Sequence, residues 1–467
     1  MSSGKETVRD LCNAMFDLER KYDLLNFEIE GVKVWQYMRV PIYYYLAERI
    51  GIFQAPHVKK SSTLSRFSRY FKYFSHAMVN NPLLHRHQVD EVVIEHPRTV
   101  SFSGEQVDIY SSFYVRDLQF HNVSYLRLDR SNVVAGQAKT RDPRRRFIAI
   151  FAGIAKIAGL LHKTRAKDDE NTKMKMVNDD LFHQFGISFD LETILTSGVR
   201  RFKVNYFLYR TLFKRVRPKR LVVIVSYAYG EAIAAAKDLG IETVEIQHGT
   251  FSRYHLGYSF PSVHLPLDYF PDRFMAWGSF WRDMGILPLS DEHVEIYGFP
   301  YFNCLRARHA DIKKDNKQVV VLSQGALGSK IADKIYMFRE ALGGFEVVYK
   351  LHPGEFARWT EYESLRKLAE LPNVQIVKEG NLYEILAGSS FQIGVFSTAV
   401  YEGIGFGCRS LLLDLPGVEY MADLVDKGLA FVVRDERELA TALEQDDQLK
   451  AFDAEAVFGA DAGSRLV

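Results

Sequence analysis

The chain has 467 residues, of which 47% are hydrophobic, 13% aromatic and 25% charged. This composition is typical of a globular protein of two or three domains, and it excludes fibrous, low-complexity and wholly disordered chains. The 60 Lys and Arg residues balance the 58 Asp and Glu residues to within a net charge of +2, so a nucleic-acid binder that works by neutralising phosphates is also excluded.

The cysteines point to a reducing compartment. Cys12, Cys304 and Cys408 lie far apart without CxxC spacing, so neither a disulfide framework nor a zinc site is indicated. The N-terminus lacks the layout of a signal peptide, and no stretch reaches the roughly 18 uninterrupted apolar residues of a spanning helix. We therefore expect a cytoplasmic protein.

The first fifty residues carry a helical pattern. Apolar side chains recur at spacings of three and four, at Leu11, Met15, Leu18, Tyr22 and Leu25. A basic and aromatic segment follows at residues 66–74, before the first buried strand at 92–94. We expect a helical N-terminal region over residues 1–89.

An apolar run with basic flanks stands at residues 141–167. Arg141, Arg144, Arg145 and Arg146 precede the apolar residues 147–155, and further basic residues follow. One interpretation is an interfacial helix lying against anionic lipid. The other is a buried helix with solvated ends, because short apolar runs are common in cores.

Strands and helices then alternate in two series. The first contains the strands 221–225 and 243–246, and the second contains 319–322, 345–351, 374–377, 391–395 and 410–413. Such alternation is typical of doubly wound parallel sheets. The sequence predicts an α/β protein with two Rossmann-like domains, 90–305 and 306–467, that face a cleft.

Candidate anion-binding residues follow two strands of the second domain, where ligands of parallel sheets bind. His352 and Pro353 come after the strand ending at residue 351, and the imidazole can donate to a phosphate oxygen. Ser397 and Thr398 read as hydroxyl caps of a helix, whose free N–H groups suit a phosphate. The alternatives are an ordinary turn and a plain helix cap.

Four more residues of this domain are candidates. Glu402, one turn into that helix, suits the hydroxyls of a ribose. Gly325 and Gly328 leave room for a nucleotide phosphate or base, and Lys330 follows them. The spacing is not that of a Walker A loop, and a flexible surface loop is the alternative.

In the first domain, the strand 243–246 ends in Gln247-His248-Gly249-Thr250. The glycine allows a tight turn that projects the His248 imidazole toward the other domain, where it can act as a base or orient an acceptor. A structural histidine is the alternative. Nearby Tyr254, His255 and Tyr258 suit contact with a sugar.

Two weaker candidates lie earlier in the first domain. They are the segment Glu95-His96-Pro97-Arg98 and the pair Asp108 and Tyr110, for which a strand with one solvated face is the alternative. No DxD pair stands at a strand end, and Asn178-Asp179-Asp180 reads as a solvated turn or helix start. We predict metal independence and no cofactor.

Together these motifs give the sequence a family resemblance over residues 90–435. Gln247-His248-Gly249-Thr250, Lys350-Leu351-His352-Pro353 and Ser397-Thr398-Ala399-Val400-Tyr401-Glu402-Gly403 resemble motifs of the GT-B superfamily of bacterial surface-polysaccharide transferases. The nearest in style are transferases of CMP-activated sugars, such as sialic acid and Kdo, and CDP-glycerol glycerophosphotransferases. Those enzymes have Trp where this chain has Gln247.

The resemblance implies a role for each motif. His352 and Pro353 match the motif that holds the donor phosphates, Ser397 and Thr398 match the hydroxyl motif after it, and His248 matches a catalytic histidine. The base or nucleophile stays open among His248, Asp108 and Glu231, in that order.

The implied activity is transfer of a sugar from a nucleotide-activated donor, CMP- or CDP-linked, to a capsule or lipopolysaccharide glycan. The implied partners are that donor, a lipid-linked or oligosaccharide acceptor and the inner leaflet of the membrane. The alternatives are a nucleotide-sugar epimerase and a catalytically silent scaffold of polysaccharide assembly.

Overall fold

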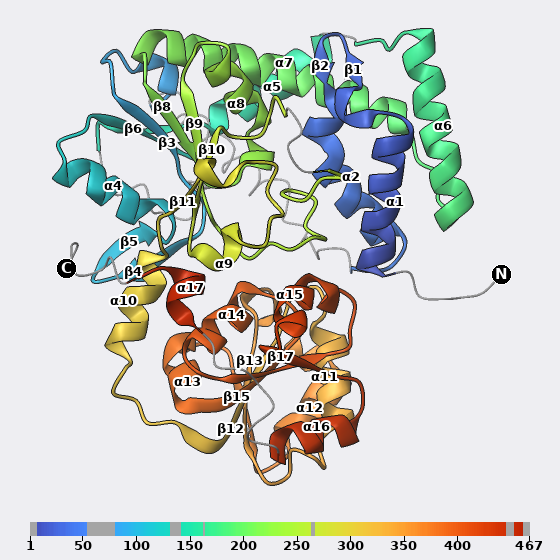
Figure 1. The fold of residues 1–467 in the computed structure, drawn as a ribbon, viewed down its shortest axis with the longest axis vertical. Coiled ribbons are helices and arrows are strands. Elements are labelled where there is room, and N and C mark those ends of the chain that lie inside the picture. Colours follow the sequence, from blue (N-terminus) through green and yellow to red (C-terminus); the bar gives the residue numbers. More distant parts are fainter. Residues whose placement is uncertain are drawn as a thin grey trace, which may run out of the picture.

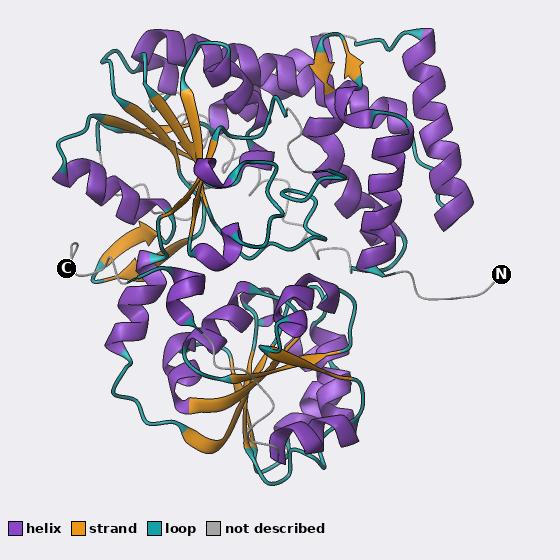
Figure 2. Cartoon of the chain, in the orientation of Figure 1, coloured by secondary structure: helices purple, strands orange, loops and turns teal. Residues whose placement is uncertain are grey.

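The computed structural model describes residues 7–53, 80–130, 142–161, 164–262, 267–444 and 453–460. Two parallel sheets, each covered by helices on both faces, form one domain above the other in Figure 1, with a group of helices beside the upper one. Figure 2 shows one fan of strands at the centre of each domain. This is the predicted α/β architecture, with two Rossmann-like domains and a helical appendage.

The first domain is built on a seven-stranded parallel sheet in the order β11-β10-β9-β8-β3-β6-β7. Its strands read as buried apolar runs because helices cover both faces. An antiparallel hairpin of β4 and β5 stands apart from this sheet. The strands are β3 (Glu91–Ile94), β4 (Thr99–Phe102), β5 (Glu105–Asp108), β6 (Tyr125–Asp129), β7 (Arg145–Phe147), β8 (Arg220–Val223), β9 (Glu242–Ile246), β10 (Arg273–Ala276) and β11 (Val294–Ile296). The helices are α4 (Ser111–Phe120), α5 (Ala149–Leu161), α7 (Leu191–Val216), α8 (Gly230–Lys237) and α9 (Ser279–Arg282).

The second domain is built on a six-stranded parallel sheet in the order β14-β13-β12-β15-β16-β17. Helix α10 (Pro300–Arg308) leads into it from the first domain. The strands are β12 (Asp315–Leu322), β13 (Glu346–Lys350), β14 (Val374–Val377), β15 (Ser389–Gly394), β16 (Arg409–Leu413) and β17 (Ala430–Val433). The helices are α11 (Gly328–Met337), α12 (Glu363–Ala369), α13 (Leu382–Gly388), α14 (Thr398–Gly405), α15 (Ala422–Asp426) and α16 (Glu436–Glu444).

The helical appendage contains α1 (Val8–Lys21), α2 (Val34–Arg49) and the short hairpin of β1 (Glu28–Ile29) and β2 (Val32–Lys33). Helix α6 (Asp168–Phe185), from the middle of the chain, joins this group (Figure 1). Asp180 therefore lies within a helix, not in the expected turn or helix start, and accepts hydrogen bonds from Lys21 Nζ at 2.6 Å and Tyr22 Oη at 2.9 Å.

The apolar run with basic flanks forms β7 and α5. Ile150 and Phe151 are buried in the core of the first domain, while Lys156 and Ile157 are exposed. Arg145 is held by ion pairs with Glu95 at 2.8 Å and Asp129 at 3.0 Å. The described part of this segment is thus a core helix with one solvated face.

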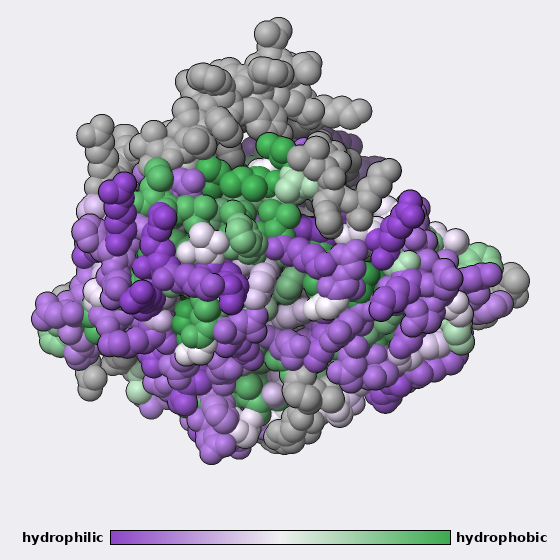
Figure 3. Space-filling view, turned by 90° about the horizontal axis from the view of Figure 1, so that it is seen from above, coloured by the Kyte–Doolittle hydropathy of each residue, from purple (hydrophilic) through white to green (hydrophobic). Residues whose placement is uncertain are grey.

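The basic and aromatic segment 66–74 and Arg141 lie outside the described residues. In the described part of the chain, no helix is long and apolar enough to span a bilayer. Seen from above, the end of the molecule that carries α7 is largely hydrophilic around a patch of hydrophobic residues (Figure 3).

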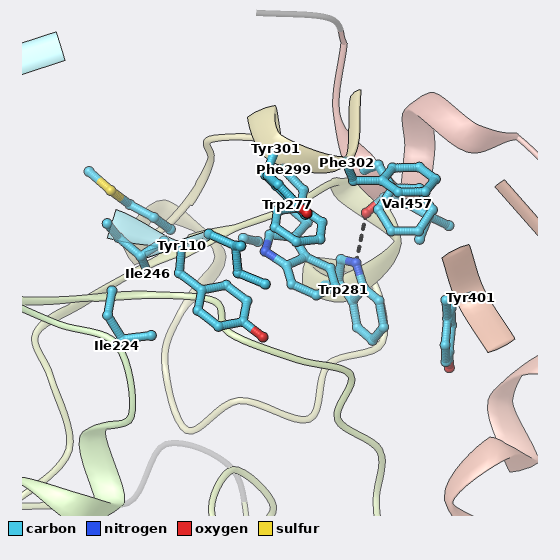
Figure 4. Packing of buried hydrophobic residues seen from close by; sticks show 14 of the residues in the cluster. Tyr110, Ile224, Ile246, Trp277, Trp281, Phe299, Tyr301, Phe302, Tyr401 and Val457 are labelled. Carbon is cyan, nitrogen blue, oxygen red and sulfur yellow. Dashed lines mark hydrogen bonds between the residues drawn. The ribbon is translucent and has the colours of Figure 1, made fainter. Parts of the chain in front are cut away.

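Helix α17 (Ala454–Phe458), the last described helix, packs against the first domain. Trp281 Nε1 donates to the carbonyl of Val457 at 2.8 Å, beside the Trp277 ring stacked on Phe299 (Figure 4). A Cβ on Gly278 would lie 2.1 Å from the Ala456 carbonyl oxygen, so only glycine lets the helix come this close. Helix α17 also contacts α14 of the second domain, so the last described helix bridges the two domains.

Candidate functional site

The motifs singled out at strand ends meet at the boundary between the two domains. His248 and Gly249 follow β9, and Ser397 and Thr398 follow β15. A Cβ placed on Gly249 would lie 3.7 Å from Thr398 Oγ1, at ordinary van der Waals distance. Two motifs that are about 150 residues apart in sequence thus form one candidate active site.

His352 is an exposed donor at this boundary. It opens a short 3-10 turn, Pro353–Glu355, in which its Nδ1 accepts from the Gly354 N–H at 3.1 Å. Desolvation, followed by the charges of Arg98 and Arg358, lowers the pKa of His352 below its ordinary value. A neutral ring that accepts at Nδ1 carries its proton on Nε2, which is therefore the donor available to a ligand.

The glycine loop after β12 lies against this ring. A Cβ on Gly325 would lie 3.1 Å from His352 Nδ1, so the structure brings these two predicted residues together. Arg358, which the sequence analysis did not identify, donates to the Gly325 carbonyl at 2.6 Å. Gly328 packs on the Glu355 side chain and is needed for packing, since a Cβ there would come within 1.7 Å of Oε1.

Ser397 is at the N-cap position of α14 but makes no capping hydrogen bond through its side chain. Ser397 thus stands at the predicted cap position with the extended backbone usual there, φ −177° and ψ 164°, but the expected capping bond of its hydroxyl does not form. The loop before it is fixed by Gln324, which accepts from the Phe396 N–H at 3.3 Å and donates to the Phe396 carbonyl. The Ser397 hydroxyl is therefore not committed to its own helix.

Glu402 is not placed as an open acceptor for a ribose. Its side chain is buried, and its Oε1 accepts from the Tyr383 hydroxyl at 2.9 Å. Burial raises the pKa of Glu402, and the positive charge of Arg98 works in the opposite direction. The next residue, Gly403, packs closely against Gln392. A Cβ added to Gly403 would lie 2.0 Å from Gln392 Oε1.

Arg98 brings a positive charge from the first domain to the second. It is exposed, follows β3, and lies 3.4 Å from the Tyr110 hydroxyl through Nη1. Its charge affects the pKa values of both His352 and Glu402 in the other domain. The sequence analysis placed this arginine in one of the weaker candidate segments. The available signal was its position just after the first strand of a parallel sheet, where ligands bind.

His248 lies in a cluster of hydrogen-bonding rings. Its Nδ1 is 2.9 Å from the Tyr258 hydroxyl, which is 2.5 Å from Glu245 Oε1. Its Nε2 is 3.4 Å from the Tyr227 hydroxyl. The ring of His96 stacks beside it at a centroid distance of 6.2 Å.

Glu245 and Tyr227 were not identified from the sequence. The available signal for Glu245 was an acidic residue in the middle of a strand that is otherwise buried on both faces. Its side chain is 0% exposed, and its Oε2 has no hydrogen-bond partner among the described residues.

Asp108 is buried, not on a solvated strand face as the alternative supposed. It accepts from the N–H groups of His96 and Tyr110, both at 2.9 Å, and from the Ser111 hydroxyl. Burial raises the pKa of Asp108 to about 6 despite these donors. Its contacts hold the segment that carries Arg98 and make it a positioning residue in this structure.

Glu231 forms its side-chain hydrogen bond within the first domain. It is buried on α8, and its Oε1 accepts from Asn205 on α7 at 2.9 Å. Burial raises the pKa of Glu231. Of the three base candidates, His248 is thus the one whose neighbour, Gly249, lies close to a donor-site motif of the other domain.

The described residues contain no group of three or more His, Cys, Asp and Glu side chains arranged to hold a metal ion. Metal independence stays a prediction.

No protein-family model matches this sequence, and no curated protein matches it either. Among solved structures, the chain is similar to UDP-GlcNAc 2-epimerase from Methanocaldococcus jannaschii, with 11% identity and a TM-score of 0.48 over 80% of this chain and 97% of that one. It is similar to MurG from Acinetobacter baumannii, with 11% identity and a TM-score of 0.48 over 79% and 94% of the two chains. A glycotransferase of kitacinnamycin gives 13% identity and a TM-score of 0.44 over 77% and 90%. At these values the fold assignment rests on the chain's own two parallel sheets.

Proposed function

We propose that the protein is a glycosyltransferase that moves a sugar from a nucleotide-activated donor to a surface glycan under construction. The observation that carries the proposal is the proximity of the His248-Gly249 turn to Thr398, since a Cβ added to Gly249 would lie 3.7 Å from Thr398 Oγ1. This places a candidate base near a candidate phosphate site. Transfer from a nucleotide needs both, because the leaving phosphate must be stabilised while the acceptor loses a proton.

The donor phosphates bind in the second domain. The Nε2–H of His352, the hydroxyls of Ser397 and Thr398 and the N–H groups at the start of α14 are donors that fit phosphate oxygens. Gly325 leaves the approach to His352 open. Arg98 adds a guanidinium from the first domain, so the nucleotide is held by both domains at once.

The acceptor hydroxyl lies against His248 in the first domain. Nε2 takes the hydroxyl proton while the acceptor oxygen bonds to the anomeric carbon and the bond from that carbon to the leaving phosphate breaks. Tyr227 and His96 line the same place and suit contact with a sugar. The sequence resemblance supports a CMP- or CDP-linked donor and a capsule or lipopolysaccharide acceptor.

The test is release of free nucleotide from a panel of nucleotide-sugars, with and without oligosaccharide acceptors. Release that depends on the acceptor and is lost in His352→Ala/Ser397→Ala supports the proposal. The matched control is Ser364→Ala on α12, whose hydroxyl donates to Asp333. Conversion of the donor sugar without any acceptor would instead indicate an epimerase, and binding without turnover of any donor a scaffold.

We also propose that the acceptor is presented at the inner face of the cytoplasmic membrane. Lys156 and Ile157 on the exposed side of α5 support this, because a basic and an apolar side chain together suit an anionic lipid surface. Lys156→Glu/Ile157→Glu should then reduce sedimentation with anionic vesicles. Equal sedimentation of both proteins would contradict the membrane contact.

A further inference from the structure

A buried carboxylate, a tyrosine and a histidine form a chain of hydrogen bonds behind the candidate site. Glu245 Oε1 lies 2.5 Å from the Tyr258 hydroxyl, and that hydroxyl lies 2.9 Å from His248 Nδ1. Glu245 and Tyr258 are both buried, at 0% and 1% exposure. Bulk water therefore does not compete for these bonds.

The number of protons decides the direction of each bond. Tyr258 donates its single hydroxyl proton to the Glu245 carboxylate oxygen Oε1. The Tyr258 oxygen then has only lone pairs left for His248, and Nδ1 must donate its own proton to that oxygen. In the neutral ring this leaves Nε2 without a proton.

We infer that Glu245 and Tyr258 are positioning residues that hold His248 in the tautomer whose Nε2 is free to accept a proton. This rests on the proposed function, because it assigns the atom of His248 that receives the proton of the acceptor hydroxyl. The Tyr227 hydroxyl lies 3.4 Å from Nε2 and can donate a hydrogen bond to it in this tautomer.

The hydrogen-bonded chain of Glu245, Tyr258 and His248, which we call the relay, also stabilises the charged ring that proton transfer produces. When Nε2 takes the proton, the imidazolium lies with its Nδ1 3.6 Å from Glu245 Oε1. Glu245 Oε2 has no hydrogen-bond partner in the described part of the chain, so its charge is not already satisfied there. Attraction between the carboxylate and the ring at this distance stabilises the charged ring formed during the reaction.

The helical appendage fixes the segment that carries Tyr258. Arg39 on α2 is buried and donates to the carbonyls of Leu256 at 2.5 Å and Ser259 at 3.0 Å, on either side of Tyr258. Glu19 on α1 pairs with Arg39 at 2.9 Å and so fixes its guanidinium. The tyrosine is thus held in place before any substrate arrives, which is what positioning of a base requires.

The test reads the tautomer directly and needs no substrate. The full-length protein is labelled with ring-¹⁵N histidine, and the His248 signals are assigned by their loss in His248→Gln. At mildly alkaline pH the wild type should show a protonated Nδ1 and a bare Nε2, and Tyr258→Phe should shift His248 toward the other tautomer. A wild-type ring protonated at Nε2 would overturn the inference.

A kinetic measurement adds a second readout. Glu245→Gln and Tyr258→Phe should each lower kcat about tenfold or more while nucleotide affinity stays unchanged, because neither residue touches the donor site. Tyr206→Phe on α7 removes a hydroxyl from the same domain, one that bonds to Asp238, and should leave kcat unchanged. Unchanged kcat in both relay variants would also overturn the inference. If the wild type transfers no sugar, the proposed function fails, and the tautomer measurement still decides the relay.

Discussion

His96 shows how burial sets the protonation of one side chain at the site. Desolvation, followed by the charges of His248 and Arg98, lowers the pKa of His96 to about 4. Its Nδ1 accepts from the Arg98 N–H at 3.1 Å, which shapes the turn that presents the arginine. A neutral His96 is therefore part of the folded state.

This pKa predicts an acid-labile contribution to stability. In the unfolded chain the histidine pKa is near 6.5, so between that pH and about 4 the unfolded state binds more protons. The contribution of His96 is complete above pH 6.5 and is lost as pH falls toward 4. His96→Asn keeps an acceptor for the Arg98 N–H, so from pH 7 to pH 5 it should lose about 1 to 2 kcal/mol less stability than the wild type. Denaturant unfolding at each pH measures this, and parallel curves would contradict it.

Asp108 gives a second prediction for a single residue. Asp108→Asn removes one of the oxygens that accept from His96, Tyr110 and Ser111. The free energy of unfolding should fall by about 1 to 3 kcal/mol, the cost of leaving buried donors unpaired. Glu105→Gln, in an exposed ion pair on the same hairpin, is the control and should change stability by less than about 0.5 kcal/mol. A change as small for Asp108→Asn would show that these bonds do not hold the segment.

At the scale of elements, the start of α14 carries a hydroxyl that we expect to serve ligand binding and not the stability of the helix. Since the Ser397 side chain makes no capping bond, its hydroxyl contributes little to the helix. In most helices the loss of an N-cap hydroxyl costs about 1 kcal/mol. We therefore expect the Ser397 hydroxyl to bind a ligand.

Ser397→Ala should therefore leave the melting temperature of the free protein unchanged and weaken nucleotide binding about fivefold to tenfold. Thermal unfolding gives the first quantity and calorimetric titration with the nucleotide gives the second. A lower melting temperature with unchanged affinity would assign the hydroxyl to the helix and not to the ligand.

Local pattern predicted most of these elements, because parallel strands covered on both faces appear as short apolar runs. The strands around 92–94, 243–246 and 319–322 lie where the sequence placed them. The roles of the acidic residues near the ends of the strands were harder to predict. The role of Glu245 depends on its hydrogen bond with Tyr258, and the contacts of Asp108 form only once β4 and β5 pair as a hairpin.

At the scale of the molecule, several contacts hold the domains in one arrangement. Arg253 pairs with Asp423 at 2.8 Å, and the hydroxyls of Tyr43 and Tyr420 are 2.5 Å apart. The meeting of Gly249 with Thr398 depends on these contacts between distant parts of the chain. The sequence predicted that His248 faces the other domain, but no local pattern contains the particular contacts between residues so far apart in the chain.

Arg98 tests whether both domains hold the nucleotide. Arg98→Ala should lower nucleotide affinity about tenfold, because a hydrogen bond to a charged group contributes about 1.5 to 3 kcal/mol. Arg116→Ala removes another arginine of the same domain, paired with Glu105, and should not affect binding. Equal affinities of wild type and Arg98→Ala, measured by titration, would place the nucleotide in the second domain alone.

The most direct test of the account is the melting temperature of the purified protein with CMP, CDP, UDP, GDP or ADP, since a bound ligand stabilises the folded state by mass action. We predict that one of these nucleotides raises the melting temperature and that His352→Ala abolishes this rise. No rise with any nucleotide, or an equal rise in His352→Ala, would contradict a donor site at His352.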